Sequence, residues 1–380
     1  MDRVRLGVIG LGNMGAAHIR DSLPKVDRLV LTAVSDADAT RMDRYEKVAQ
    51  FENPSDLIQS GLVNAVLIAT PHYAHTSVGI EALEAGLHVL VEKPISVHKA
   101  DCEKLIAAHK GQVFAAMFNQ RTDGAYQAIR RLVQSGELGE IKRVSWIITN
   151  WFRSEAYYAS GGWRATWGGE GGGVLLNQAP HNLDLFQWMF GMPVRLRAFC
   201  GFGKYHDIEV EDDVTAYVEF ANGATGTFIT TTGEFPGSNR LEIAADRGRV
   251  TYQDGKIVFD RTSESVSEFS KTTPSSFPGM PTWRCEIPTS NPSNQHLEII
   301  KNFTAAILDG AELLAPAVEG IHSVELANAM ILSSLDGETI ELPMDSARYE
   351  AKLAELVKNS ARSKPAGYSE VADLSSSFGN

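Results

Sequence analysis

Two groups of polar residues in this sequence carry side chains that could move a proton. The first is Glu92-Lys93-Pro94, which follows a short apolar run, 87–91, typical of a buried β-strand. Ligands of open α/β sheets bind at the carboxyl ends of strands, and a lysine desolvated there can act as a general acid or base. The alternative is an ordinary surface lysine at the end of a strand.

The second group lies in the glycine-rich segment from Gly171 to Asp184. Asn177 and His181 are four residues apart, so they share a face if this segment is helical. Histidine titrates near neutral pH, and an amide can orient a hydroxyl group. The alternative is a glycine turn that leads into a helix, with His181 as a hydrogen-bonded histidine of the core.

A glycine motif near the start of the chain predicts a dinucleotide site. The apolar run 4–9 leads into Gly10-Leu11-Gly12-Asn13-Met14-Gly15, and a helical pattern follows. The first glycine allows a tight turn, the second lets a pyrophosphate approach the backbone, and the third lets the helix pack closely on the strand. We expect cofactor contacts from Gly10, Gly12, Asn13 and Met14. An ordinary glycine turn is the alternative.

An acidic residue completes this signal. A second apolar run, 29–34, ends at Ser35-Asp36, which lies 21 positions after Gly15. Asp36 can accept hydrogen bonds from ribose hydroxyls, whereas it would repel a 2′-phosphate. The motif therefore predicts NAD rather than NADP as the cofactor.

Polar residues also follow two further apolar runs. Thr70-Pro71-His72-Tyr73-Ala74-His75 follows the run 64–69, and Asn119-Gln120-Arg121 follows the run 113–118. Both segments are expected at the sheet edge where the nicotinamide half of the cofactor would lie. His75 could equally be a structural histidine at the start of a helix. The predicted cofactor contacts from these strand ends are Thr70, His72, His75, Glu92, Lys93 and Asn119, and Gln120 is predicted to contact the substrate.

The pattern of elements divides the chain into two parts. Strand-like runs alternate with helical patterns such as 76–85 and 99–109 up to residue 118, which predicts a parallel sheet with helices on both faces. After a helix at 123–135, short turns such as Asn222-Gly223 and Asp254-Gly255 join strand-like runs, which predicts an antiparallel sheet. The predicted strands are 140–152, 193–202, 213–220, 224–232, 239–245, 248–253 and 256–260. A long loop at 261–295, helices at 296–309 and 318–335, and a polar tail complete the prediction.

Composition limits the class of protein. The 380 residues are too many for one ordinary core, and the formal net charge of −12 disfavours nucleic acid and anionic membranes as partners. No apolar run is long enough to span a membrane, and the first strand begins too early for a signal peptide. Three isolated cysteines fit neither a disulfide framework nor a zinc site, and we expect a cytoplasmic protein with no metal.

Together these motifs resemble the glucose–fructose oxidoreductase, inositol dehydrogenase and MocA family (Gfo/Idh/MocA). The similarity extends over about residues 3–343, and Glu-Lys-Pro after the fifth strand is its specific marker. The resemblance implies an N-terminal Rossmann domain (1–122), a C-terminal substrate-binding and oligomerisation α/β domain (123–361) with an open, mostly antiparallel sheet, and a C-terminal tail (362–380). It also implies a homodimer or homotetramer.

The resemblance further implies NAD-dependent oxidation of a secondary hydroxyl of a sugar, anhydrosugar, glycoside or polyol. Lys93 and His181 match the family's catalytic lysine and histidine, but Asn177 stands where the family has aspartate, so the identity of the base stays open. The aromatic-rich segment 151–167 suits a sugar ring, with about half of it expected in the core or at an interface. The predicted substrate contacts are Asn177, Tyr157, Trp163, Arg164 and Gln120. The alternatives are a glycosidase that uses tightly bound NAD and a non-catalytic dinucleotide sensor.

Overall fold

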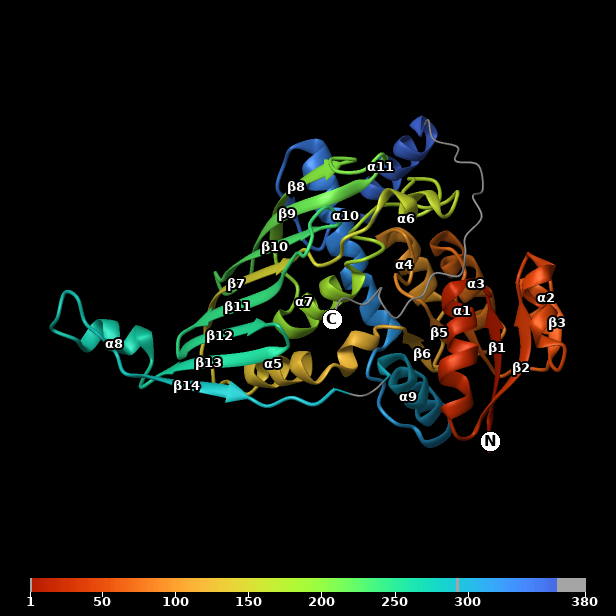
Figure 1. Ribbon diagram of the computed structural model, residues 1–380, viewed down its shortest axis with the longest axis horizontal. Coiled ribbons are helices and arrows are strands. Elements are labelled where there is room, and N and C mark those ends of the chain that lie inside the picture. Colours follow the sequence, from red (N-terminus) through yellow and green to blue (C-terminus); the bar gives the residue numbers. More distant parts are fainter. Residues whose placement is uncertain (1, 292–293, 361–380) are drawn as a thin grey trace.

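The computed structural model describes residues 2–291 and 294–360, so the predicted tail at 362–380 lies outside the described residues. The described chain is built on two sheets with helices between and around them (Figure 1). The boundaries predicted at residues 122 and 361 stay predictions.

The first sheet confirms the predicted Rossmann-type arrangement. Over the described residues it has six parallel strands in the order β3-β2-β1-β4-β5-β6. The strands are β1 (Val4–Ile9), β2 (Leu29–Ser35), β3 (Ala49–Phe51), β4 (Ala65–Ile68), β5 (His88–Val91) and β6 (Phe114–Ala116). The helices that connect them include α1 (Asn13–Ala17), α2 (Pro54–Gln59), α3 (His72–Glu84) and α4 (Lys99–Ala107). Helix α3 begins at His72 rather than at the predicted residue 76, because Pro71 ends the extended segment and the helix starts directly after it.

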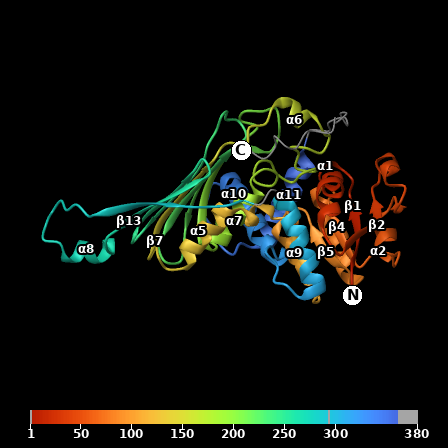
Figure 2. The ribbon, with the colours of Figure 1, turned by 60° about the horizontal axis from the view of Figure 1, so that its bottom comes forward.

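The second sheet is mostly antiparallel, as predicted. Its described strands run in the order β14-β13-β12-β11-β7-β10-β9-β8-β15, and only the central pair β7 and β10 is parallel. The strands are β7 (Ile141–Ile148), β8 (Arg195–Phe202), β9 (Glu211–Glu219), β10 (Thr225–Thr231), β11 (Asn239–Ala245), β12 (Gly248–Gln253), β13 (Lys256–Thr262), β14 (Thr282–Ile287) and β15 (Ile340–Glu341). One face of this sheet packs on α5 (Gly124–Gln134), α7 (Pro180–Phe190) and α10 (Gly320–Asp336), which lie between the two sheets (Figure 2).

The prediction of a loop at 261–295 is wrong. This segment contains α8 (Val266–Thr272), which projects away from the body of the molecule, and the edge strand β14, which pairs with β13 (Figure 1). Ser265 caps α8 by accepting a hydrogen bond from the Glu268 amide, and main-chain hydrogen bonds hold β14. Because neither element buries an apolar stripe, the hydrophobic pattern did not reveal them; Phe277 between them is 96% exposed.

Helix α9 (Gln295–Asp309) returns the chain to the first sheet. Its apolar residues Ile299, Ile300 and Phe303 are buried in the core of the parallel sheet, although in sequence they follow all the described strands of the second sheet except β15. The short helix η6 (Ala317–Glu319) and α10 then lead back, and α11 (Ser346–Asn359) ends the described chain. None of the described helices is long and apolar enough to cross a membrane.

Candidate active site

The glycine turn between β1 and α1 has the geometry that the motif predicts. Gly10 adopts a positive φ of 92°, and a Cβ at Gly15 would lie 1.9 Å from the Gly10 carbonyl oxygen, so only glycine fits at either position. A Cβ at Gly12 would meet only the Arg41 guanidinium, at 3.9 Å. The fold therefore does not need glycine at position 12, and the open space above it suits the approach of a ligand to the backbone. Asn13 and Met14 begin α1 beside it and are half-buried.

Asp36 at the end of β2 holds this turn. One carboxylate oxygen accepts a hydrogen bond from the Leu11 amide at 2.7 Å, and the other accepts from the Asp38 amide at 2.9 Å. Arg41 lies 3.6 Å from the same carboxylate. Each carboxylate oxygen can accept a second bond, so Asp36 can still receive a ribose hydroxyl.

Buried polar atoms without a partner mark the rest of the strand edge. Within the described residues, four such side-chain atoms are Thr70 Oγ1, Asn119 Oδ1, Gln120 Oε1 and His181 Nδ1. Thr70 follows β4, Asn119 and Gln120 follow β6, and His181 lies in the first turn of α7. Burying a polar atom without a hydrogen bond is unfavourable. Hydroxyl and amide groups of a bound dinucleotide, together with the hydroxyl groups of a polyol, could form the hydrogen bonds that these atoms lack.

Lys93 lies at the centre of this edge. Its Nζ donates a hydrogen bond to the Asn177 main-chain oxygen at 2.7 Å, which joins the Rossmann sheet to the glycine-rich segment. Burial lowers the pKa of Lys93, and the charges of Glu92 and Glu170 oppose that change. Glu92 itself is buried against His18 at 2.7 Å. Burial raises the pKa of Glu92, but the His18 hydrogen bond and the charges of His18, His296 and Lys93 together outweigh it and lower this pKa to about 2. Glu92 is therefore an anion that stabilises the Lys93 ammonium.

His181 is a neutral base in this arrangement. It is 4% exposed, and burial lowers its pKa well below the usual value, with the Lys93 charge acting in the same direction. The Phe118 ring contacts the imidazole edge-on at 6.2 Å between centroids. A neutral imidazole with an unpartnered buried nitrogen can accept a proton or a hydrogen bond from a ligand.

The two histidines of the β4–α3 segment have different surroundings. His75 places both ring nitrogens against main-chain oxygens, Nδ1 at 2.7 Å from Pro94 and Nε2 at 2.8 Å from Thr70. It thus joins the Thr70 turn to the Lys93-Pro94 turn, as a structural histidine would. His72 Nδ1 lies 3.2 Å from the Glu170 main-chain oxygen, and burial lowers its pKa to about 3. Direct cofactor contacts of both histidines stay predictions.

The aromatic-rich segment 151–167 divides between the site and the core, as expected for about half of it. Tyr157 OH accepts a hydrogen bond from Arg164 Nη1 at 2.8 Å and lies 3.4 Å from Asn177 Oδ1, so these three residues form one group. The half-buried Trp163 lies against the Arg164 guanidinium at 4.9 Å. The neighbouring aromatic residues Trp151, Tyr158 and Trp167 instead belong to the core of the second sheet.

Three buried carboxylates in or beside the glycine-rich segment were given no role by the sequence prediction. Glu170 accepts a hydrogen bond from the side-chain amide of Asn177. Asp184 accepts two hydrogen bonds from the Arg121 guanidinium. Glu211 accepts from the main-chain amides of Gly173 and Leu175. Burial raises the pKa of Glu211 to about 7. The only signal in the sequence is an acidic residue inside or beside an apolar or glycine-rich run.

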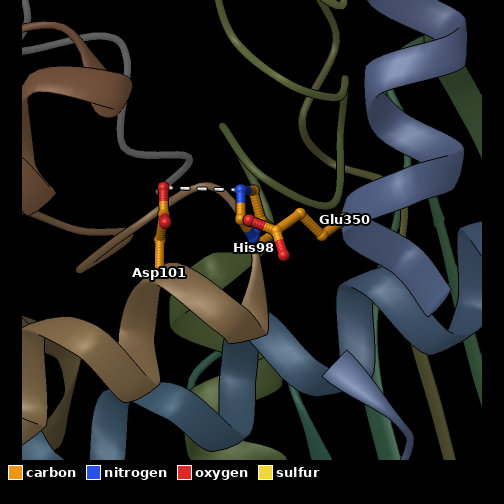
Figure 3. A group of neighbouring side chains, drawn as sticks. All are labelled: His98, Asp101 and Glu350. Atoms are coloured by element: carbon orange, nitrogen blue, oxygen red, sulfur yellow. Dashed lines mark ion pairs between the residues drawn. The ribbon is translucent and has the colours of Figure 1, made fainter. Parts of the chain in front are cut away.

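One group of side chains has the composition of a metal site but lies outside this cluster. His98, Asp101 and Glu350 meet where α4 faces α11, with His98 Nε2 3.4 Å from Asp101 (Figure 3). The Lys104 ammonium lies 2.8 Å from Asp101 and 3.1 Å from Glu350. A cation of the chain itself therefore balances the acidic groups.

Comparison with known proteins identifies the family. The family model described as "Oxidoreductase family, NAD-binding Rossmann fold" matches residues 4–119, and the GFO/IDH/MocA C-terminal domain matches residues 126–251. Myo-inositol 2-dehydrogenase from Thermotoga maritima is 27% identical over 263 residues, which cover 65% of this chain and 74% of that protein. Inositol 2-dehydrogenase 2 from Paenarthrobacter aurescens is 26% identical over 357 residues, which cover 89% and 98%.

A solved structure agrees with this assignment. The WlbA dehydrogenase from Chromobacterium violaceum, in complex with NADH and UDP-GlcNAcA, superimposes with a TM-score of 0.76 at 26% identity. The match covers 91% of this chain and 97% of the WlbA chain. The first family model covers the parallel sheet, and the second covers the chain from α5 into β12 of the second sheet. The Paenarthrobacter relative and the WlbA structure cover 89% and 91% of this chain, so each matches both sheets. The chain therefore belongs to the GFO/IDH/MocA oxidoreductase family, and its parallel sheet is the NAD-binding Rossmann fold of that family.

Proposed function

We propose that this protein oxidises a secondary hydroxyl of a sugar, anhydrosugar, glycoside or polyol, with NAD rather than NADP as the oxidant. The observation that carries the proposal is that Lys93, directly after β5, bonds the Asn177 main-chain oxygen at 2.7 Å, four residues before His181, whose buried Nδ1 has no partner among the described residues. The relatives named as inositol dehydrogenases and the sugar-nucleotide complex of WlbA support a polyhydroxylated substrate.

The chain's own residues have distinct parts in this reaction. Gly12 and Asp36 would hold the cofactor, and bound NAD supplies the hydride acceptor. Lys93 and His181 contact the reacting hydroxyl, and one of them accepts its proton as the hydride leaves. The neighbouring hydroxyls of the substrate ring are oriented by the side chains of Asn177, Tyr157 and Arg164. The protein thus contributes position and acid–base groups.

A substrate screen tests this proposal. The purified protein is incubated with NAD and a panel of sugars, anhydrosugars, sugar acids, glycosides and polyols, and NADH is followed by its absorbance. Net NADH formation supports the dehydrogenase. Release of nitrophenol from an aryl glycoside without NADH would instead show the NAD-containing glycosidase, and tight NAD binding with neither product would show a sensor.

We also propose that the protein works in the cytoplasm as a homodimer or homotetramer. Free thiols at Cys102, Cys200 and Cys285 support a reducing compartment. Phe199 and Tyr217 are 63% and 43% exposed on neighbouring strands β8 and β9, which supports contact through this face of the sheet. Light scattering of Phe199→Glu against the unmodified protein tests this surface, and an unchanged mass would contradict it.

A further inference from the structure

Glu170 places a buried carboxylate beside the candidate catalytic group. The residue is 2% exposed and lies directly before Gly171. One carboxylate oxygen accepts a hydrogen bond from the Ala165 amide at 2.7 Å, and the other accepts from the side-chain amide of Asn177. Each oxygen therefore has one defined donor, so the orientation of the carboxylate is fixed.

Asn177 links this carboxylate to Lys93. Its Nδ2 points to Glu170, so its Oδ1 faces the other way and accepts from Gln178 Nε2 at 3.1 Å, with Tyr157 OH at 3.4 Å. Its main-chain oxygen accepts from Lys93 Nζ at 2.7 Å. One residue thus bonds the lysine through its backbone and the carboxylate through its side chain.

The negative charge of Glu170 acts on Lys93 and Arg164 at a distance and not through a direct ion pair. Among the described residues, the ion pairs within 4 Å do not include Glu170. Burial raises its pKa, while the charges of Arg164 and Lys93 lower it. Conversely, the Glu170 charge raises the pKa of Lys93 against the effect of burial.

We propose that Glu170 is a positioning residue of the dehydrogenase: its carboxylate fixes the orientation of the Asn177 amide and, together with Glu92, balances the charge of Lys93. The inference rests on the proposed function, because it assigns Lys93 to the reacting hydroxyl. Asparagine at position 177 carries no charge, so in this chain the second negative charge near Lys93 comes from Glu170. The charged and titratable groups that act on Lys93 or feel its charge are Glu92, Glu170, Arg153, Arg164, His72, His75, His181 and His296.

An exchange of charge and amide tests the proposal. The Ala165 and Asn177 donors lie at different oxygens of the Glu170 carboxylate. In E170Q the glutamine oxygen can therefore face only one of these donors, and the other donor faces the new NH2 group. In E170Q/N177D, the glutamine oxygen can accept from Ala165 while its NH2 donates to one oxygen of the new carboxylate at position 177. The other oxygen of that carboxylate then accepts hydrogen bonds from Gln178 and Tyr157. The double variant therefore restores both the hydrogen bonds and one carboxylate.

The first measurement does not depend on activity. The pH dependence of Lys93 acetylation by acetic anhydride, read by peptide mass spectrometry, gives the pKa of Lys93. We expect this pKa to fall by about one pH unit in E170Q and to return to the wild-type value in the double variant. The matched control is Glu209→Gln, which removes a carboxylate that accepts from the Trp167 amide in the same region, and it should leave Lys93 unchanged.

The second measurement is the pH profile of kcat/KM. E170Q should lose about 10- to 100-fold in kcat/KM, with its acidic limb at lower pH, and the double variant should recover most of the loss. An E170Q protein with wild-type Lys93 titration, or a double variant as impaired as E170Q, would overturn the proposal. If E170Q does not fold, a lowered Lys93 pKa in the folded double variant overturns it. If wild type forms no NADH while Lys93 titration shifts as expected, only the proposed function fails.

Discussion

The pair Arg121 and Asp184 allows a stability prediction with a magnitude. Arg121 Nε and Nη2 donate to the two Asp184 oxygens at 2.7 and 2.6 Å, and both side chains are 1% exposed. Arg121 also donates to Glu319 at 2.5 Å, but the Glu319 side chain is 40% exposed. The first ion pair is fully desolvated, whereas water reaches the second.

Removing Asp184 should therefore lower the free energy of unfolding much more than removing Glu319. Asp184→Asn leaves a buried guanidinium without its bidentate partner, and breaking such a pair costs about 3–5 kcal/mol. Glu319→Gln removes a partner that is already partly hydrated, so it should cost about 0–1 kcal/mol. At about 3 kcal/mol per molar urea for a protein of this size, the first change lowers the urea midpoint by about 1 M or more.

Urea unfolding followed by circular dichroism and by tryptophan fluorescence measures both variants. Trp188 lies over the Arg121 guanidinium at 5.4 Å, so its fluorescence reports on this location. Equal losses in the two variants, or a loss below about 1 kcal/mol in Asp184→Asn, would refute the reasoning from burial.

Three further predictions concern the site. Lys93→Ala should lower kcat by about 10²–10⁴ while NADH binding, measured by fluorescence titration, changes little; a near-native kcat would make Lys93 a structural residue. Asp36→Ser combined with Ala37→Arg should move the ratio of kcat/KM values toward NADP, and an unchanged ratio would contradict the role of Asp36. Because burial lowers the pKa of His72 to about 3, its neutral form stabilises the fold above pH 6.5. This stability is lost as pH falls, at about 1.4 kcal/mol per pH unit down to about pH 3. His72→Gln should reduce the slope of the unfolding free energy against pH by that amount, as measured by urea unfolding between pH 3 and pH 6.5. An unaltered slope would contradict the burial of His72 as its cause.

Local motifs explain how much of the site the sequence could predict. Gly10 and Gly15 act within one turn, so their spacing encodes their geometry directly. Asp36 bonds that turn from the end of the neighbouring strand β2, as the strand–helix–strand order of the motif predicts. Lys93 was predicted from its place at the carboxyl end of a strand, and His181 from its spacing to Asn177 and from the family resemblance; their catalytic roles stay predictions. The structure joins Lys93 to the Asn177 main-chain oxygen, a contact that the motifs do not specify.

Residues that act through distant partners could not be predicted in this way. The bond of Asp184 to Arg121 spans 63 positions, and that of Glu211 to Gly173 spans 38. In the sequence alone, Asp184 and Glu211 resemble ordinary charged surface residues. Their partners become evident only from the packing of α7 and β9. Likewise β14 depends on pairing with β13 instead of on an apolar pattern of its own.

The return of α9 to the parallel sheet has a mechanical consequence. The chain leaves the parallel sheet for the second sheet once after β6 and again before α10, and these two crossings lie side by side. The Ala116 amide donates to the Ala315 oxygen at 2.9 Å, and Arg121 reaches the Leu314 oxygen. The chain also crosses back between β14 and α9, so three crossings join the two sheets. The two crossings that lie side by side hold the sheets together along one line. We therefore expect any relative motion of the two halves to be a bending about this line, and a truncation after residue 122 to leave the parallel sheet without its α9 cover.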